Sequence, residues 1–269
     1  MNTTLSAPRT VRNYAAGNRA GELVREWRQR RRMSQLALAA KAGCSQRHLR
    51  FVESGRAGAG REMILRLGEA LDLPLRARNE LLLAAGFAPL YEQRTLDHMA
   101  MLAANQALER ILQHHEPYPA MVLDAGWHIR KMNRACARIV GAAANRETNL
   151  LRLLCTELRP GIRSWPRTGQ ALLARLRREA SAYPGCAAEA LLDELKSAFP
   201  VFDAGDPPVE PVMPVEIMIG GDCLRLFTML TTFGTPQDVT LEELRIEMSF
   251  PADEASDGLL RAWAANTER

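Results

Sequence analysis

Apolar side chains recur at a helical spacing through the first third of the chain, over residues 21–86. Leu23 and Trp27 are four residues apart, so they share one face of a helix expected over residues 22–32. The other faces of this helix are polar and rich in arginine. A helix with one apolar stripe buries that stripe against its neighbours. The pattern therefore predicts an all-helical first domain.

Two further short helices are expected over residues 35–42 and 46–54. Ser34 and Ser45 precede them, at the position where a serine side chain caps free backbone N–H groups. Gly43 lies between the two helices and can take the positive φ that a tight turn requires. Two short helices joined by such a turn form a helix-turn-helix unit.

The apolar pattern changes in the rest of the chain. Residues 96–115 favour one amphipathic helix, which can link two domains, mediate dimerisation or simply pack on the next domain. Alternating positions then predict strands over residues 120–123, 127–132, 215–219, 223–232 and 244–250. Helices are expected between them, over residues 134–140, 149–154, 164–182 and 187–198. This order predicts an α+β domain with a largely antiparallel sheet, covered by helices on one side.

Charge divides the chain in the same way as the apolar pattern. The 269 residues leave room for two domains of about 100–200 residues each. Residues 1–95 hold 17 Lys and Arg against 8 Asp and Glu, a net charge of +9. Residues 96–269 hold 18 against 23, a net charge of −5. A basic first domain is typical of contact with a polyanion such as DNA.

Composition excludes several classes of protein. No apolar run approaches the roughly 18 residues of a membrane-spanning helix, and the N-terminal segment lacks the apolar core of a secretory signal. The five cysteines are widely spread without a Cys-x-x-Cys pair, which favours reduced thiols. We therefore expect a cytoplasmic protein with no membrane contact.

Catalytic signatures are missing as well. The sequence has no Gly-rich phosphate loop, no His-Glu-x-x-His and no Gly-x-Ser-x-Gly motif. We accordingly expect no enzymatic activity, no metal site and no cofactor. An enzyme attached to a DNA-binding domain is the alternative that this search disfavours.

The second helix of the helix-turn-helix unit carries long hydrogen-bond donors. Gln46, Arg47 and Arg50 lie on its outward side, from which they can reach base edges and phosphates in a major groove. Exposed arginines also occur on ordinary helical bundles, so the donors alone leave that alternative open.

The helix-turn-helix residues resemble those of the lambda-repressor/Cro-type (XRE) family. The resemblance rests on Ser34-Gln35, Leu38-Ala39, Ala42-Gly43, Ser45-Gln46, Leu49 and Glu53-Ser54-Gly55-Arg56. It implies a five-helix domain whose fourth and fifth helices cover residues 62–71 and 75–85. Leu36 and Phe51 depart from the pattern, since relatives often place polar side chains there. Phe51 can contact a thymine methyl group or fill a packing role.

The same resemblance implies roles for single residues. Gln35 is expected to bind phosphate and brace the recognition helix, and Glu53 to act as a structural brace. Arg56 follows the Ser54-Gly55 turn, where relatives contact the DNA backbone. The positions that face DNA in the family are occupied here by Ser45, Gln46, Arg47 and Arg50.

The second part of the chain resembles the MmyB-like ligand-binding domain of bacterial regulators. The similar segments are residues 115–124 with Trp127, residues 133–135, residues 149–154 and residues 231–238. This resemblance implies a PAS-like fold that holds a small apolar ligand, with a fatty acid reported for the group. Residues that can line such a pocket are Trp127, Met132, Phe227, Met229, Met248 and Phe250. Arg130, Asn133 or Arg225 can bind a carboxylate, although side chains at this spacing also form ordinary cores.

Together these patterns predict a regulator in four parts. They are a flexible arm over residues 1–16, a DNA-binding domain over 17–91, a connecting helix over 92–116 and a PAS-like domain over 117–269. We expect a homodimeric repressor at the bacterial nucleoid that binds an operator in double-stranded DNA and senses a small hydrophobic molecule. The alternative is a ligand-independent DNA-binding protein whose second domain serves dimerisation or a protein partner.

Overall fold

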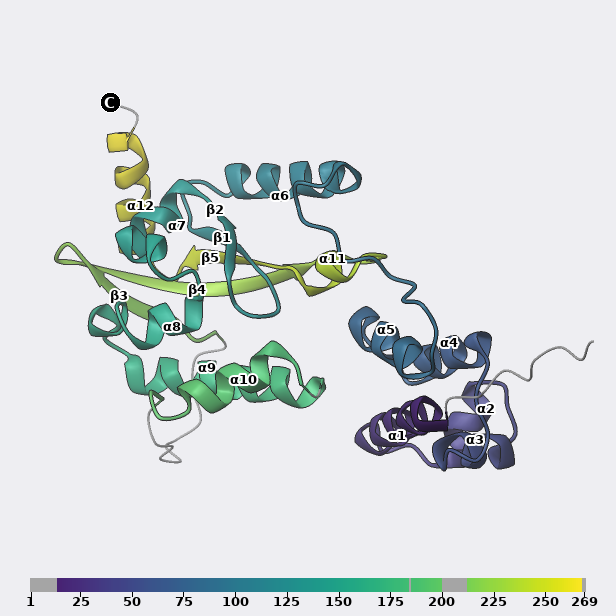
Figure 1. The fold of residues 1–269 in the computed structure, drawn as a ribbon. Coiled ribbons are helices and arrows are strands. Elements are labelled where there is room, and N and C mark those ends of the chain that lie inside the picture. Colours follow the sequence, from purple (N-terminus) through teal and green to yellow (C-terminus); the bar gives the residue numbers. More distant parts are fainter. Residues whose placement is uncertain (1–13, 184, 200–211, 268–269) are drawn as a thin grey trace, which may run out of the picture. The chain divides into compact units, whose positions relative to one another are not determined.

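The chain forms two compact units. The computed structural model describes residues 14–183, 185–199 and 212–267. Unit 1 comprises Met1–Gln93 with Gln237–Val239, and unit 2 comprises Arg94–Pro236 with Thr240–Arg269. Each unit is described by itself, with its elements labelled in Figure 1.

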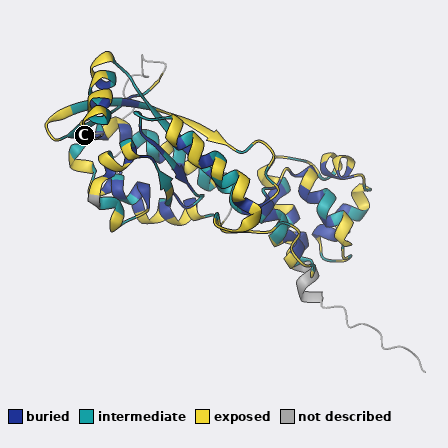
Figure 2. Cartoon of the chain, turned by 90° about the horizontal axis from the view of Figure 1, so that it is seen from above, coloured by how far each residue is buried: buried dark blue, intermediate teal, exposed yellow. Residues whose placement is uncertain are grey.

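Unit 1 is a bundle of helices, as the sequence predicts. Its five helices are α1 (Tyr14–Arg30), α2 (Gln35–Lys41), α3 (Gln46–Glu53), α4 (Arg61–Ala70) and α5 (Leu75–Ala84). Their buried sides face one another, as the dark-blue residues in Figure 2 show. The lambda-repressor-like fold class is thereby confirmed.

The first helix begins earlier than its apolar pattern indicates. The structure starts α1 at Tyr14, although we expected a flexible arm to residue 16 and a helix only from residue 22. Ala20 is buried and precedes the larger Val24 and Trp27 on the same face. Alanine favours helix but adds little hydrophobic signal, which explains the misplaced boundary. Residues 1–13 of the predicted arm lie outside the described residues.

Gly21 permits a close contact between α1 and α3. A Cβ atom built on Gly21 would lie 2.1 Å from the carbonyl oxygen of Val52. That distance is far below any real contact, so α1 can reach α3 only where a residue lacks a side chain.

Unit 2 contains a five-stranded antiparallel sheet. Its strands are β1 (Ala120–Leu123), β2 (Ile129–Met132), β3 (Val215–Ile219), β4 (Asp222–Thr232) and β5 (Arg245–Pro251). They lie in the order β2-β1-β5-β4-β3, so the first strand and the last are neighbours at the centre. All of its strand pairs are antiparallel, and the predicted α+β, PAS-like class is confirmed.

Short and long helices surround this sheet. They are η1 (Met99–Met101), α6 (Leu102–His114), α7 (Arg134–Val140), η2 (Gly141–Asn145), α8 (Leu150–Cys155), η3 (Arg159–Gly161), α9 (Trp165–Ala182), α10 (Ala187–Leu195), α11 (Val239–Glu243) and α12 (Glu254–Thr267). Figure 1 shows α6 on one face of the sheet and α8, α9 and α10 on the other. Our prediction of helices on one side only was wrong.

The helix expected as a connector over residues 92–116 is part of unit 2. Leu108 and Leu112 of α6 are buried in one cluster with Val122 of β1 and Ile246 of β5. Packing on the next domain, one of the readings that the sequence left open, is therefore the one observed. The helix α12 had no counterpart among the predicted elements.

We predict that Gly21→Ala separates α1 from α3 and destabilises unit 1. The inserted methyl group meets backbone rather than a movable side chain, so we expect a loss of about 1–3 kcal/mol, as in overpacked cores. Thermal denaturation of the full chain, followed by helical circular dichroism, should then show a melting temperature lower by about 4 °C or more.

The matched control is Gly58→Ala, where a Cβ meets nothing within 4 Å. A melting temperature of Gly21→Ala equal to that of Gly58→Ala would show that the close contact is unimportant.

Candidate functional site

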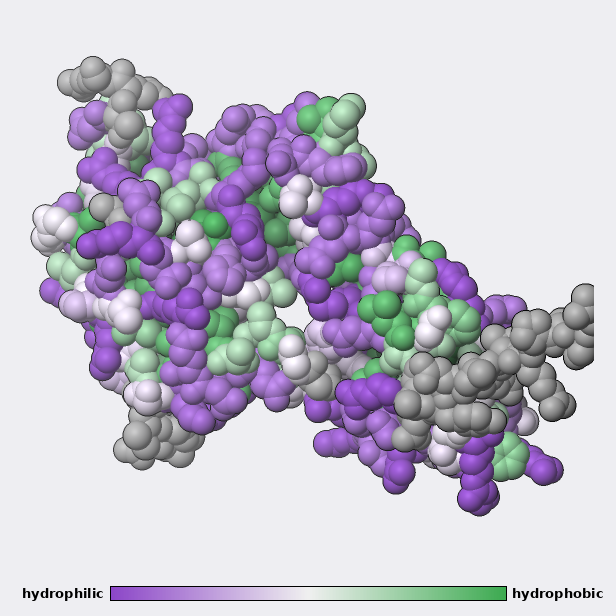
Figure 3. Space-filling view, in the orientation of Figure 1, coloured by the Kyte–Doolittle hydropathy of each residue, from purple (hydrophilic) through white to green (hydrophobic). Residues whose placement is uncertain are grey.

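The helix α3 has one buried and one exposed side. Leu49, Val52 and Glu53 are buried in unit 1. The side chains predicted to face DNA are exposed: Ser45, Gln46, Arg47 and Arg50. In Figure 3, the part of unit 1 around α1 and α3 is mostly hydrophilic. The structure thus gathers four of the six predicted DNA-binding residues on one polar surface.

Serine caps fix where the two helices of the motif begin. The Ser34 hydroxyl accepts a hydrogen bond from the backbone N–H of Ala37, and the Ser45 hydroxyl accepts one from that of His48, each at 3.1 Å. An N-cap contributes about 1 kcal/mol to helix stability. Ser45 can still donate its own O–H proton outward, since it is exposed.

A buried carboxylate holds the first three helices together. Glu53 of α3 accepts two hydrogen bonds from Arg28 of α1, at 2.6 and 2.9 Å. It also accepts one from Gln35 of α2 at 2.8 Å. The side chains of Arg28 and Glu53 are only 12% and 3% exposed, and the hydrogen bond to Glu53 raises the pKa of Arg28. Gln35 is therefore committed to this brace, with one N–H left over.

Sequence reasoning missed the part that Arg28 plays. It lies in an arginine-rich helix, where the pattern cannot tell an inward arginine from an exposed one. Arg28 and Glu53 are 25 residues apart in the sequence, so only the folded bundle brings them into contact.

Three arginines on this surface keep their charge free. Within the described residues, none of Arg47, Arg50 and Arg56 forms an ion pair with a carboxylate, and all three are exposed. The guanidinium carbon of Arg47 lies 5.5 Å from the ring centroid of Phe51. Phe51 is half-buried, so the residue that departs from the family pattern supports Arg47 as a cation–π partner.

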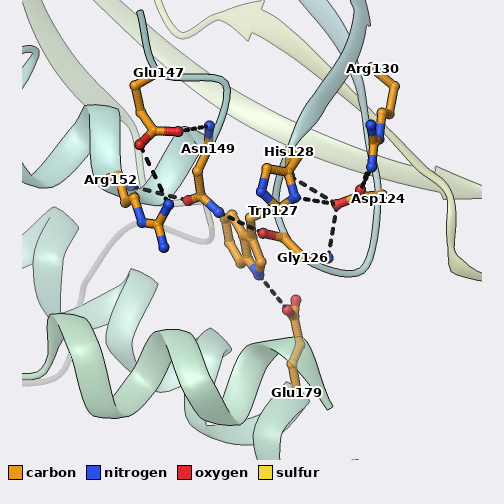
Figure 4. Close-up of polar contacts among 9 residues, drawn as sticks. All are labelled: Asp124, Gly126, Trp127, His128, Arg130, Glu147, Asn149, Arg152 and Glu179. Atoms are coloured by element: carbon orange, nitrogen blue, oxygen red, sulfur yellow. Dashed lines mark hydrogen bonds and ion pairs between the residues drawn. The ribbon is translucent and has the colours of Figure 1, made fainter.

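Trp127, predicted to line a ligand pocket, is packed in the hydrophobic core of unit 2 and also contacts three charged side chains. The guanidinium carbons of Arg175 and Arg245 lie 4.2 and 4.4 Å from its ring. Its Nε1 donates to Glu179 at 2.8 Å, as Figure 4 shows. Burial lowers the pKa of Arg245, with Glu179 opposing the shift. Trp127 is fully buried and forms one cluster with Arg175, Arg245 and Glu179.

The predicted donors for a ligand carboxylate already have partners. Arg130 pairs with Asp124, its Nε at 2.8 Å (Figure 4). Burial tends to raise the pKa of Asp124, but hydrogen bonds from His128 and Arg130 lower it overall. Asn133 is buried, and its side chain bonds four backbone groups, those of Ala120, Cys136, Leu112 and Tyr118. Arg225, the third predicted donor, pairs with Glu216 and Asp253, each at 3.3 Å, so all three side chains have partners within unit 2.

The remaining predicted ligand residues do not share one site. Met229 pairs with Met248 across β4 and β5, and Phe227 with Phe250, so these four share one face of the sheet. Met132 pairs with Met121, which pairs with Glu247 on the opposite face. Because neighbouring residues of a strand alternate between faces, the predicted set is split by the sheet. Alternation along single strands could not tell which residues of different strands share a face, because that depends on the register of the sheet.

One cavity of unit 2 lies away from these residues. It has a volume of about 390 Å³ and is formed by α7, α12 and the segment before Pro119. Its lining residues are Glu116, Pro117, Arg134, Ala135, Arg138, Leu260, Trp263 and Ala264. None of the predicted ligand residues belongs to it, and five of its eight lining residues come from the turn at Glu116 and Pro117 and from α12, where the sequence predicts no site.

The described residues also bear on other classes of site. Among them no helix has the length and apolar character to cross a membrane, and no group of three His, Cys, Asp or Glu could hold a metal. The five cysteines are free thiols. Burial raises the pKa of Cys136 to about 12 and that of Cys155 to about 11, which keeps both protonated and unreactive.

We predict that Glu53→Ala unfolds the brace between α1, α2 and α3. Removing one member of a buried ion pair leaves Arg28 uncompensated and costs about 3–5 kcal/mol. Amide hydrogen exchange of the full chain should show lost protection in α1 and α3, with protection in β4 and β5 retained.

The control is Glu62→Ala, which removes an exposed carboxylate paired with Arg66 at 2.9 Å on α4. Exposed pairs of this spacing contribute about 0.3–0.5 kcal/mol. If both substitutions reduced protection equally, the buried carboxylate would have no special role.

Comparison with known proteins assigns both units. Residues 104–262 match the model of the MmyB-like transcription regulator ligand binding domain, and residues 24–77 match a helix-turn-helix model. Both are parts of transcription regulators rather than enzymes. The search of curated proteins found no match.

One similar solved structure is a high-resolution crystal structure of the restriction-modification controller protein C.AhdI from Aeromonas hydrophila. It is 32% identical to this chain, covers 24% of this chain and 98% of its own length, and has a TM-score of 0.23. The family models cover both units and agree with the resemblance found in the sequence. The chain belongs to the family of helix-turn-helix transcription regulators with an MmyB-like ligand-binding domain.

Proposed function

We propose that this DNA-binding regulator is a repressor that reads its operator with α3 and senses a small hydrophobic molecule, such as a fatty acid, in unit 2. It acts as a homodimer in the bacterial cytoplasm, at the nucleoid. Gln46, Arg47 and Arg50 read bases, while Gln35, Ser45 and Arg56 contact the DNA backbone.

The observation that carries this proposal is the exposed donor surface of α3 on a rigidly braced helix. Long donors can form paired hydrogen bonds with base edges only when their helix is held firmly against the duplex. Glu53 supplies that rigidity from the buried side of the same helix. The uncompensated charges of Arg47, Arg50 and Arg56 favour a polyanion as the partner.

Dimerisation follows from the requirements of reading DNA. One short helix contacts few base pairs, and a two-fold dimer doubles that number on half-sites about one DNA turn apart. A ligand can then regulate binding by favouring one spacing of the two reading helices. Its affinities for the two states must differ by about 1–3 kcal/mol for such a shift to matter.

The second candidate function is a DNA-binding protein whose unit 2 serves dimerisation or a protein partner without a ligand. Exposed apolar residues of unit 2, among them Met99 at 90% and Leu102 at 58% exposure, favour a contact surface of this kind. Native mass spectrometry of the purified chain distinguishes the two. A retained small molecule supports sensing, whereas only bare protein masses favour the second candidate.

We predict that Gln46→Ala and Arg47→Ala each weaken binding to the operator by about 1–3 kcal/mol, with little effect on random DNA. The operator is first selected from genomic fragments with the unmodified chain, and affinities are then measured by fluorescence anisotropy. Arg110→Ala is the control, since Arg110 is an exposed arginine of α6. Equal losses on operator and random DNA would reduce both residues to phosphate contacts.

Arg56→Ala should act in a different way. Loss of this phosphate contact from both copies of the dimer weakens binding to every sequence and reduces the slope of log affinity against log salt by about 1.8. The same anisotropy titrations at several salt concentrations measure this slope. A slope identical to that of the unmodified chain would place Arg56 away from the DNA.

A further inference from the structure

The cavity of unit 2 combines cationic and apolar walls. Leu260 of α12 is only 1% exposed and forms part of an apolar floor together with Pro117. Arg134 and Arg138 lie one helical turn apart on α7 and face the same cavity. The residues at i and i+4 of a helix lie on one side, so their charges act at one place.

The charges of these arginines are not balanced inside the unit. Within the described ranges, neither Arg134 nor Arg138 forms an ion pair with a carboxylate. Glu116 also lines the cavity, but its Oε1 accepts a hydrogen bond from the backbone N–H of Arg134 at 2.7 Å. One carboxylate against two guanidinium groups leaves an excess positive charge beside an apolar floor.

Arg138 is held in place by the helix on the other side of the cavity. Its guanidinium carbon lies 4.4 Å from the ring centroid of Trp263, and its Nη1 is 3.5 Å from the carbonyl oxygen of the same residue. A guanidinium ordered in this way loses less conformational freedom when it binds an anion. The cavity therefore has a positioned donor before any ligand arrives.

We propose that the cavity between α7 and α12 binds a small organic acid, with its carboxylate at Arg134 and Arg138 and its apolar part against Leu260 and Pro117. An inorganic anion would satisfy the arginines but leave the apolar floor uncovered. A neutral apolar molecule would cover the floor but leave the charges unpaired. The volume of about 390 Å³ is within the range of small-molecule sites.

This inference names the site and the head group for the sensing function proposed above, and it rests on that function only for its effect on DNA. Binding is measured first, by isothermal titration calorimetry on the full chain. The probes form two pairs: decanoate with decanol, and phenylacetate with phenethyl alcohol. The pairs separate aliphatic from aromatic acids, and each alcohol tests the need for the charge.

We expect one acid to bind the full chain in a one-to-one complex, about tenfold or more tightly than its alcohol, because charge-assisted hydrogen bonds to two arginines are lost in the alcohol. The double variant Arg134→Gln/Arg138→Gln should bind that acid no better than the alcohol. The control Arg110→Gln removes an exposed arginine of α6 outside the cavity and should bind like the unmodified chain.

A second variant guards against an indirect loss of binding. Ala135→Leu fills part of the cavity from α7 while keeping both arginines, so it should abolish binding without lowering the melting temperature. Binding of the acid to Ala135→Leu, or equal binding to the double variant, would overturn the proposal. So would equal affinity for acid and alcohol, or no binding of either acid.

The effect on DNA is tested separately, by anisotropy with and without the acid. Binding of the acid in the cavity with unchanged operator affinity would remove the sensing function but leave this site intact. A DNA response to an acid that persists in the double variant would preserve sensing and place the ligand elsewhere.

Discussion

The exposed donor surface of α3 in unit 1 depends on one buried carboxylate. Glu53 receives three hydrogen bonds, two from Arg28 and one from Gln35, and so links α3 to α1 and α2. Desolvating an ion pair is costly, and it is tolerated here because every oxygen of the carboxylate has a donor. The geometry of this contact decides which side of α3 faces solvent. Gly21 also lets α1 approach the backbone of α3 at Val52.

Unit 2 holds charged side chains next to its hydrophobic core. The ring of Trp127 contacts both Arg175 and Arg245. Glu179 accepts the indole N–H of Trp127 at 2.8 Å and pairs with Arg175 at 3.0 Å and with Arg245 at 3.1 Å. Aromatic faces and carboxylates together offset the cost of burying guanidinium groups. This cluster ties the loop after β1 to α9 and β5. Within it the indole ring of Trp127 is fully buried.

Local sequence signals predicted the elements that local forces determine. The caps Ser34 and Ser45 marked two helices to within a residue or two, because a cap acts within one turn. Alternation located the strands of the sheet because it, too, depends only on neighbouring residues in the chain. The start of α1 was missed because small residues add little to the hydrophobic pattern. The helix α12 was not among the predicted elements, so its part in the cavity was missed as well.

The candidate sites show the same division. The exposed donors of α3 follow from a single amphipathic helix, so residue spacing was enough to place them. Placing the predicted ligand residues required the sheet register, which pairs Met229 with Met248 but puts Met132 on the opposite face. Arg134, Arg138 and Trp263 come together only through packing of α7 on α12, more than a hundred residues apart in the chain.

The location of the cavity has a consequence for how a ligand could act. The helix α12 is held on the sheet by specific contacts, since Ser256 accepts the backbone N–H of Arg225 and Asp257 accepts the hydroxyl proton of Tyr118. A molecule in the cavity adds contacts between this helix and α7, and so favours the docked arrangement over any other. A ligand shifts an equilibrium only by the difference between its affinities for the two states. In this chain that difference would come from the contacts that α12 alone contributes, through Leu260 and through the stack of Trp263 on Arg138.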